Sequence, residues 1–294
     1  MVWCSGWRLA SAVSNAGGLG LLGAGSMHPD TLREHIQKCR KATDRPFGVN
    51  VPLMYPQIDE IMNLLVEEEV KIVFTSAGNP KLWTPFLKEH GMTVVHVVSS
   101  SKFARKCEEA GVDAVVAEGF EAGGHNGREE TTTLCLIPAV RRATSLPLIA
   151  AGGIGTGRGM LAAMALGAEG VQIGTRFALT EESSAHPGFK AHGLFLEEGD
   201  TKLLLKKLSP TRLVKGGFRQ AVEEAEARGA SADELRELLG RGRAKLGIFE
   251  GDLENGELEL GQVASLFRQS QTVAEVMKEI TTEYDEALRA MEHY

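Results

Sequence analysis

The feature that most constrains the fold of this chain is a unit that repeats through its first 176 residues. Each unit has a short apolar run, a glycine-rich or polar loop, and a segment whose apolar residues recur every three or four positions. Such alternation is typical of parallel strands that are covered by helices. Seven runs are expected to form strands: residues 19–22, 47–50, 72–75, 94–98, 115–118, 148–151 and 171–174.

Two α/β architectures satisfy this pattern, a closed (β/α)8 barrel and an open doubly wound sheet. The TIM-type barrel is favoured, because loops with chemically useful residues follow nearly every strand, and a ring suits them better than a single crevice. A closed barrel needs eight strands, and the chain opens close to a helix expected at residues 8–15. The remaining strand is therefore expected before Met1.

Beyond Phe177 the alternation gives way to mostly helical sequence. Three parts are predicted: the barrel at residues 1–176, a smaller helical subdomain at 177–255, and a C-terminal segment at 256–294 whose last helix packs back on the barrel. Residues 202–217 carry no acidic residue, which reverses the charge of the whole chain. The cations of this run are Lys202, Lys206, Lys207, Arg212 and Lys215.

Charge and composition exclude several classes of protein. A net charge of −7 over 294 residues argues against general nucleic-acid binding. The four cysteines lack Cys-x-x-Cys spacing, so neither a zinc site nor a disulfide framework is indicated, and no metal is expected. No apolar run approaches the ~20 residues that span a bilayer, and no signal-peptide pattern is visible. We therefore expect a soluble, cytoplasmic protein without membrane contact.

Residues 117–127 form a glycine-rich loop that leaves one of the expected strands. Its glycines allow positive φ angles and close approach of the backbone to a ligand. His125 sits among them, with Glu118 and Glu121 just upstream, and this combination indicates a reaction centre. The alternative is a common strand-end turn with a structural histidine, bonded to Glu118 or Glu121.

Three more loops carry residues of chemical interest. Glycine-rich turns at 151–157 and 173–176 follow the last two strands, where backbone N–H groups commonly bind a phosphate in a barrel. Residues 75–80 offer a floor for a flat ring, and the amide of Asn50 suits the edge of a flavin or pyrimidine. The alternative is that these residues only form caps and tight turns.

Taken in order, these segments resemble the FMN-dependent enoyl-acyl-carrier-protein reductases. That family belongs to the superfamily that includes the nitronate monooxygenases. The resemblance also extends through residues 182–187 and 261–264, so it covers most of the chain. It is carried by Phe-Gly-Val-Asn at 47–50, Ser-Ala-Gly-Asn-Pro at 76–80, Ala-Glu-Gly and Glu-Ala-Gly-Gly-His within 117–125, Ala-Ala-Gly-Gly-Ile at 150–154 and Gly-Thr-Arg-Phe at 174–177.

The resemblance implies that residues 1–176 form a barrel with bound FMN, and that His125 faces the ring and the substrate. Members of the family usually have a first strand that ends in Gly-Gly-Met, and this chain begins at the equivalent of that Met. The phosphate is expected near Gly152, Gly153, Gly174 and Thr175, and the rest of the cofactor near Asn50, Ser76, Ala77, Glu118, Gly123 and Gly124.

The favoured function is the reduction of 2-enoyl thioesters of acyl carrier protein in fatty acid synthesis, with NADH or NADPH as co-substrate. Hydride passes through FMN to the β-carbon, while His125 supplies a hydrogen bond to the thioester oxygen or a proton to the α-carbon. Residues 118–127 and 175–187 are close to the reductase branch. The alternatives are a nitronate monooxygenase, in which His125 is a base and reduced flavin meets oxygen, and a non-catalytic flavin-binding barrel.

The resemblance also implies protein partners. The basic run at 202–217 would suit the acidic surface of acyl carrier protein through electrostatic steering. A solvated helical face explains the same charges. A homodimer is the expected assembly of the chain itself.

Overall fold

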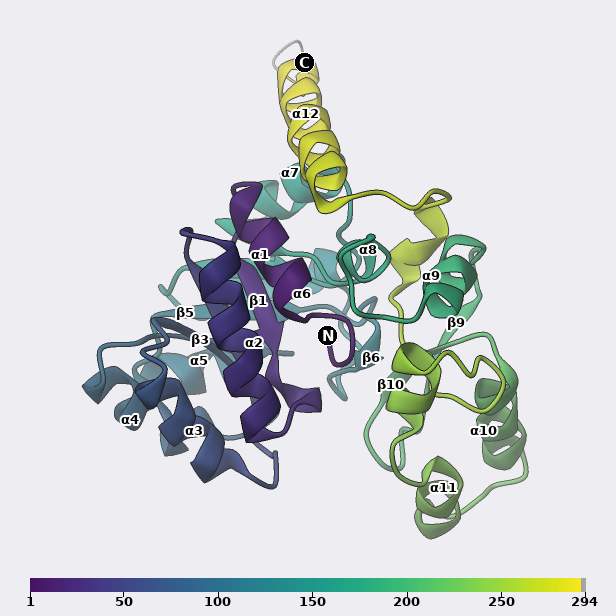
Figure 1. Cartoon of the computed structure of the whole chain (residues 1–294). Helices are drawn as coiled ribbons and strands as arrows, with labels where there is room; N and C mark the ends of the chain where they lie inside the picture. Colours follow the sequence, from purple (N-terminus) through teal and green to yellow (C-terminus); the bar gives the residue numbers. More distant parts are fainter. Residues whose placement is uncertain (292–294) are drawn as a thin grey trace.

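The main sheet has seven parallel strands, and the computed structural model describes residues 1–291 of the chain (Figure 1). The order of the strands in the sheet is their order in the chain. A doubly wound sheet requires a reversal of strand order, so the barrel prediction is confirmed. The strands are β1 (Gly20–Gly23), β2 (Phe47–Pro52), β3 (Ile72–Ser76), β4 (Thr93–Val98), β5 (Ala114–Glu118), β7 (Leu148–Ala151) and β8 (Gly170–Gln172).

The sheet curls into an incomplete barrel with two apolar faces. Val73 and Val115 face outward into a core shared with the helices, whereas Phe74 and Val116 belong to the inner cluster. Successive residues of a strand point to opposite faces, so these strands carry apolar residues on both faces. β1 and β8 are the two outer strands, and no ladder joins them within residues 1–291.

Helices cover the outer face of the sheet (Figure 1). Local signals set their ends: Ser100 Oγ accepts a hydrogen bond from the Phe103 N–H at the start of α5, and Gly111, at φ +80°, follows its end. The helices are α1 (Trp7–Asn15), α2 (Pro29–Ala42), α3 (Ile58–Glu67), α4 (Thr84–Glu89), α5 (Ser101–Ala110), α6 (Thr133–Arg141) and α7 (Gly157–Ala165), with short 3-10 turns η1 (Ala24–Ser26) and η2 (Pro80–Leu82).

After the barrel the chain forms a smaller accessory part, for which we keep residues 177–255 as the proposed bounds. Its apolar core gathers around Phe218, Val222 and Leu235. The elements from the end of the sheet onward are α8 (Thr175–Ala178), α9 (Pro187–Leu194), β9 (Thr201–Leu204), β10 (Thr211–Val214), α10 (Gly217–Ala227), α11 (Ala232–Leu239), the π-helix η3 (Lys245–Phe249) and the 3-10 helix η4 (Gln262–Leu266).

The helical interpretation of the basic run at 202–217 is wrong. The run forms two antiparallel strands, β9 and β10, and β10 also pairs with β6 (Gly124–His125) in a three-stranded sheet. Pro210 in the connection fixes φ and cannot donate an N–H, which disfavours a helix there. The leucines of β9 and β10 are buried, so packing rather than charge decides the structure of this segment.

The last helix, α12 (Val273–Met291), begins after the accessory part and returns to the barrel beside α7 (Figure 1). Its apolar face buries Val273, Val276 and Ile280. A Cβ at Gly157 would lie 2.3 Å from the backbone of α12, so glycine permits this close approach. Within residues 1–291, no helix has the combination of length and apolarity needed to cross a membrane.

Candidate functional site

The predicted ring-binding residues lie at the carboxyl ends of neighbouring strands. Asn50 is near the end of β2, and its Nδ2 donates to the carbonyl of Phe74, at 3.3 Å. Ser76 ends β3, and Ala77 follows it with a left-handed φ of +51°. A non-glycine residue in this region is uncommon and concentrates at functional turns, so the backbone of this turn is held in place by its surroundings.

Glu118 and Gln172 face the interior from the opposite side of the rim. In the register of the sheet, Glu118 on β5 is opposite Ala151 on β7, and Ala151 is opposite Gln172 on β8. Burial raises the pKa of the Glu118 carboxyl to about 7. Gln172 Oε1 is buried and accepts no hydrogen bond from any described residue. Sequence reasoning missed Gln172, although a polar residue inside an apolar strand was the available signal.

The two glycine turns after β7 and β8 are adjacent, because these strands are paired. Gly152 and Gly153 have φ angles of +89° and +68°, and a Cβ at Gly152 would lie 2.5 Å from the carbonyl oxygen of Gly119. The N–H groups of Gly153, Gly174 and Thr175 donate to no acceptor among residues 1–291. Free amides that meet at one edge are the donor set of an anion site.

The loop that carries His125 joins the small sheet instead of the barrel. His125 is level with Thr211 on β10, and its exposed imidazole makes no hydrogen bond to a described residue. The structural alternative, in which the ring binds Glu118 or Glu121, is not what the structure shows. Glu121 instead accepts from the N–H and Oγ1 of Thr133, at 3.0 and 2.9 Å. The imidazole is therefore available to a ligand.

The His125 loop also contacts the glycine turns. Gly261, which precedes η4, lies between the loop and the second glycine turn. Its N–H donates to Thr175 Oγ1 of that turn, at 2.8 Å. A Cβ added at Gly261 would lie 2.8 Å from the Glu121 carbonyl oxygen and 3.2 Å from the Gly123 amide nitrogen. The structure thus brings the loop and the second glycine turn together at one residue.

Arg212 fixes the start of the same loop. It is 2% exposed, and its Nε and Nη2 donate to the Phe120 carbonyl oxygen at 3.2 and 2.7 Å. Its guanidinium also lies over the ring of Phe120, at 4.7 Å. The sequence placed Arg212 among surface cations, but it is a buried residue that ties β10 to the loop.

A pair of carboxyl groups lies behind the loop. Burial and the neighbouring Glu259 raise the pKa of Glu257 to about 8. A Cβ at Gly124 would lie 2.7 Å from Glu259 Oε2, and Gly124 has a φ of +74°, so a side chain here would displace this carboxyl group and strain the backbone. Carboxyl groups in contact favour a shared proton over two charges. No sequence signal linked these residues to a loop more than a hundred positions earlier.

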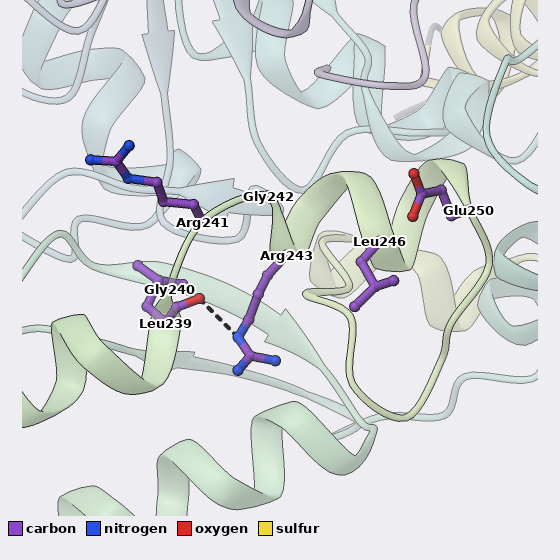
Figure 2. Close-up of a pocket in the computed structure, with 7 residues that line it drawn as sticks. All are labelled: Leu239, Gly240, Arg241, Gly242, Arg243, Leu246 and Glu250. Carbon is purple, nitrogen blue, oxygen red and sulfur yellow. Dashed lines mark hydrogen bonds between the residues drawn. The ribbon is translucent and has the colours of Figure 1, made fainter.

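A cavity of about 380 Å³ is lined by different residues, between the end of α11 and η3 (Figure 2). Arg243 points to the backbone there: its Nε donates to the Leu239 carbonyl oxygen at 2.8 Å, and its guanidinium lies 4.7 Å from the Phe218 ring centre. Arg241 points in another direction (Figure 2). The bonds of Arg243 therefore close the turn that ends α11.

Comparison with known proteins agrees with this geometry. The family model for nitronate monooxygenase matches residues 1–64 and 57–283. The chain belongs to the nitronate monooxygenase family. This family is one of flavin-dependent oxidoreductases. FabK from Thermotoga maritima, a solved structure, is 42% identical with a TM-score of 0.95, over 100% of this chain and 93% of FabK.

Two curated relatives of this chain are named as different enzymes. A "(3aS,4S,5R,7aS)-5-hydroxy-7a-methyl-1-oxo-octahydro-1H-indene-4-carboxyl-CoA dehydrogenase" from Rhodococcus jostii is 39% identical over 65% of this chain and 53% of its own length. A probable nitronate monooxygenase from Bacillus subtilis is 37% identical over 67% of this chain and 68% of the relative. The chain thus spans between half and about two thirds of these relatives.

Proposed function

We propose that this family member is an FMN-dependent reductase of 2-enoyl thioesters that uses NADH or NADPH. The observation that carries the proposal is the likeness to FabK, an enoyl-acyl-carrier-protein reductase, along the whole chain. The Rhodococcus relative, a carboxyl-CoA dehydrogenase by name, adds a second relative with a thioester substrate. Fatty acid synthesis is the proposed setting.

The residues at the rim fit FMN. Gly152, Gly153, Gly174 and Thr175 would hold the phosphate, since amides of both turns have no acceptor within residues 1–291. Gln172 Oε1, a buried acceptor without a donor, would meet an N–H of the ring. We propose Asn50, Ser76, Ala77 and Glu118 as the other contacts of the ring, with Gly123 and Gly124 bringing the loop close to it.

Bound FMN supplies hydride transfer between the nicotinamide and the β-carbon of the thioester. The protein would supply polarisation, and we assign this role to His125. Its free imidazole would donate a hydrogen bond to the thioester oxygen as that oxygen gains negative charge, or a proton to the α-carbon. Arg212 and Glu121 keep the loop in place, so the histidine is pre-oriented at little cost on binding.

Nitronate oxidation is the second candidate function, supported by the family model and by the Bacillus relative. In that reaction His125 would be a base instead of an acid. The test is to purify the protein with its flavin and to compare NADH or NADPH oxidation with crotonyl-CoA against oxygen uptake with propyl nitronate. Enoyl-dependent oxidation supports the reductase. Nitronate turnover alone rejects it, and a yellow protein without either activity favours a non-catalytic flavin barrel.

We propose acyl carrier protein as the macromolecular partner, docked near the hairpin of β9 and β10. Two lysines of the basic run form ion pairs, so this surface is less cationic than the run alone indicates. Lys206 pairs with Glu130 at 2.5 Å, and Lys215 pairs with Asp200 at 3.4 Å. An acidic partner must compete with these pairs, so steering contributes modestly.

Charge reversal tests the docking surface. K206E/K207E should raise the KM for enoyl-acyl-carrier protein much more than the KM for crotonyl-CoA. The double variant K102E/R105E, on α5, is the matched control and should change neither. An equal effect of K206E/K207E on both substrates removes the proposal.

We also propose a cytoplasmic location and a homodimer. The cysteines, which are all unpaired, support a reducing compartment. Sedimentation equilibrium tests the dimer, and a mass of one chain at micromolar concentration would contradict it.

A further inference from the structure

The last helix of the chain reaches both of the turns that we assign to the FMN phosphate. On α12, Glu283 Oε2 accepts a hydrogen bond from the N–H of Gly157, at 2.7 Å. Gly157 closes the first glycine turn and begins α7. A carboxylate at a helix N-terminus is favourable, so this contact holds the turn and the helix together. Arg158, whose Nε lies 3.6 Å from Glu283 Oε1, is the cation beside it.

The second contact runs through Arg176, which directly follows the turn of Gly174 and Thr175. Arg176 is 3% exposed, and its Nη1 donates to the carbonyl oxygen of Gly155 at 2.7 Å. Its Nη2 lies 2.6 Å from Glu279 Oε2 on α12. Arg176 therefore bridges the two turns, and Glu279 supplies the negative charge that its buried guanidinium requires.

Glu279 and Glu283 are four residues apart, so they lie on one face of α12. One rigid helix thus contacts the first turn directly and the second turn through an arginine. A phosphate that takes N–H donors from two separate turns binds well only if the spacing of the turns is held to within roughly 0.5 Å.

We propose that Glu279 and Glu283 are positioning residues for the FMN phosphate, and that α12 braces the two phosphate-binding turns. The inference rests on the proposed function, because it takes FMN as the ligand. By linkage, a brace that tightens FMN binding is itself stabilised when FMN binds. FMN should therefore slow the opening of α12.

The experiment uses apoprotein and two ligands, FMN and riboflavin, with affinity measured by quenching of flavin fluorescence. Riboflavin lacks the phosphate. The substitutions E279Q and E283Q should each weaken FMN binding by about tenfold or more and leave riboflavin binding unchanged. R176K should behave in the same way, because lysine keeps the charge but not the forked geometry. D285N, an exposed acid on the same helix, is the matched control.

A general loss of structure would weaken both ligands alike, so equal effects on FMN and riboflavin overturn the inference, as does an unchanged FMN affinity. Amide hydrogen exchange on the wild-type protein needs no variant. Exchange in residues 273–291 should slow at least tenfold when FMN is added and stay unchanged with riboflavin. Absence of this slowing also overturns it. A wild-type chain that binds neither flavin rejects the proposed function itself, which is a distinguishable result.

Discussion

His96 on β4 provides a test of the electrostatics of the barrel that is independent of its ligand. The side chain is 4% exposed on the helix-covered face of the sheet, and its Nδ1 lies 2.6 Å from Thr75 Oγ1. Burial lowers the pKa of the imidazole to about 4, from an ordinary 6.5. Between these values the unfolded chain binds more protons than the folded chain, so stability must fall as the pH falls.

The size of the effect follows from the two pKa values. Lowering the pH from roughly 8 to roughly 5 should cost about 2 kcal/mol of unfolding free energy through His96 alone. H96Q removes the titration and keeps a polar partner for Thr75. Urea unfolding at each pH gives the free energy of unfolding of the wild type and of H96Q. Titratable groups other than His96 contribute equally to both proteins, so their contributions cancel in the difference. A difference that does not change with pH refutes the claim that this histidine is buried and neutral.

Three further predictions concern a buried arginine, a glycine at a helix contact and a buried carboxyl group. R212M should lower kcat for enoyl reduction at least tenfold, because the Phe120 carbonyl loses its two donors, whereas R219M should leave kcat within about twofold; equal losses would contradict the positioning role. G157A should destabilise the chain by about 2 kcal/mol, since its Cβ would meet the α12 backbone, while G170A, with open space around it, should be nearly neutral in urea unfolding. Burial and Glu259 raise the pKa of Glu257 from 4.5 to about 8, so between these values the folded chain binds more protons than the unfolded chain and stability falls as the pH rises through this window. E257Q should therefore gain stability relative to wild type as the pH is raised, and a relative loss would contradict the shared proton.

The strands and helices of the barrel could be predicted because each has a strong local signal. Apolar runs such as residues 94–98 sit between glycine or polar punctuation, and β4 occupies Thr93–Val98. The later hairpin could not be predicted in this way. Residues 201–214 combine lysines with leucines in a pattern that suits either structure, and its pairing with Gly124 and His125 decides the outcome.

The candidate site also has residues that the sequence could predict and residues that it could not. The glycine turns and His125 could be predicted from the sequence. Clustered glycines indicate positive φ angles, and a lone histidine among them indicates a candidate reactive group. The residues that hold them in place could not be predicted in this way. Glu259, Arg212 and the acids of α12 are ordinary charged residues, and only the fold brings them against loops that are far away in the chain.

Reoxidation of the reduced flavin by a thioester is the most direct test of the proposed reductase activity. The flavin of the purified protein is reduced with NADH or NADPH under anaerobic conditions, mixed with crotonyl-CoA, and followed by its absorbance in a single turnover. Oxidised flavin should return rapidly with the thioester, and at least a hundredfold more slowly in H125N. A flavin that stays reduced with the thioester, and reoxidises only with oxygen or in the presence of a nitronate, would contradict the proposed activity.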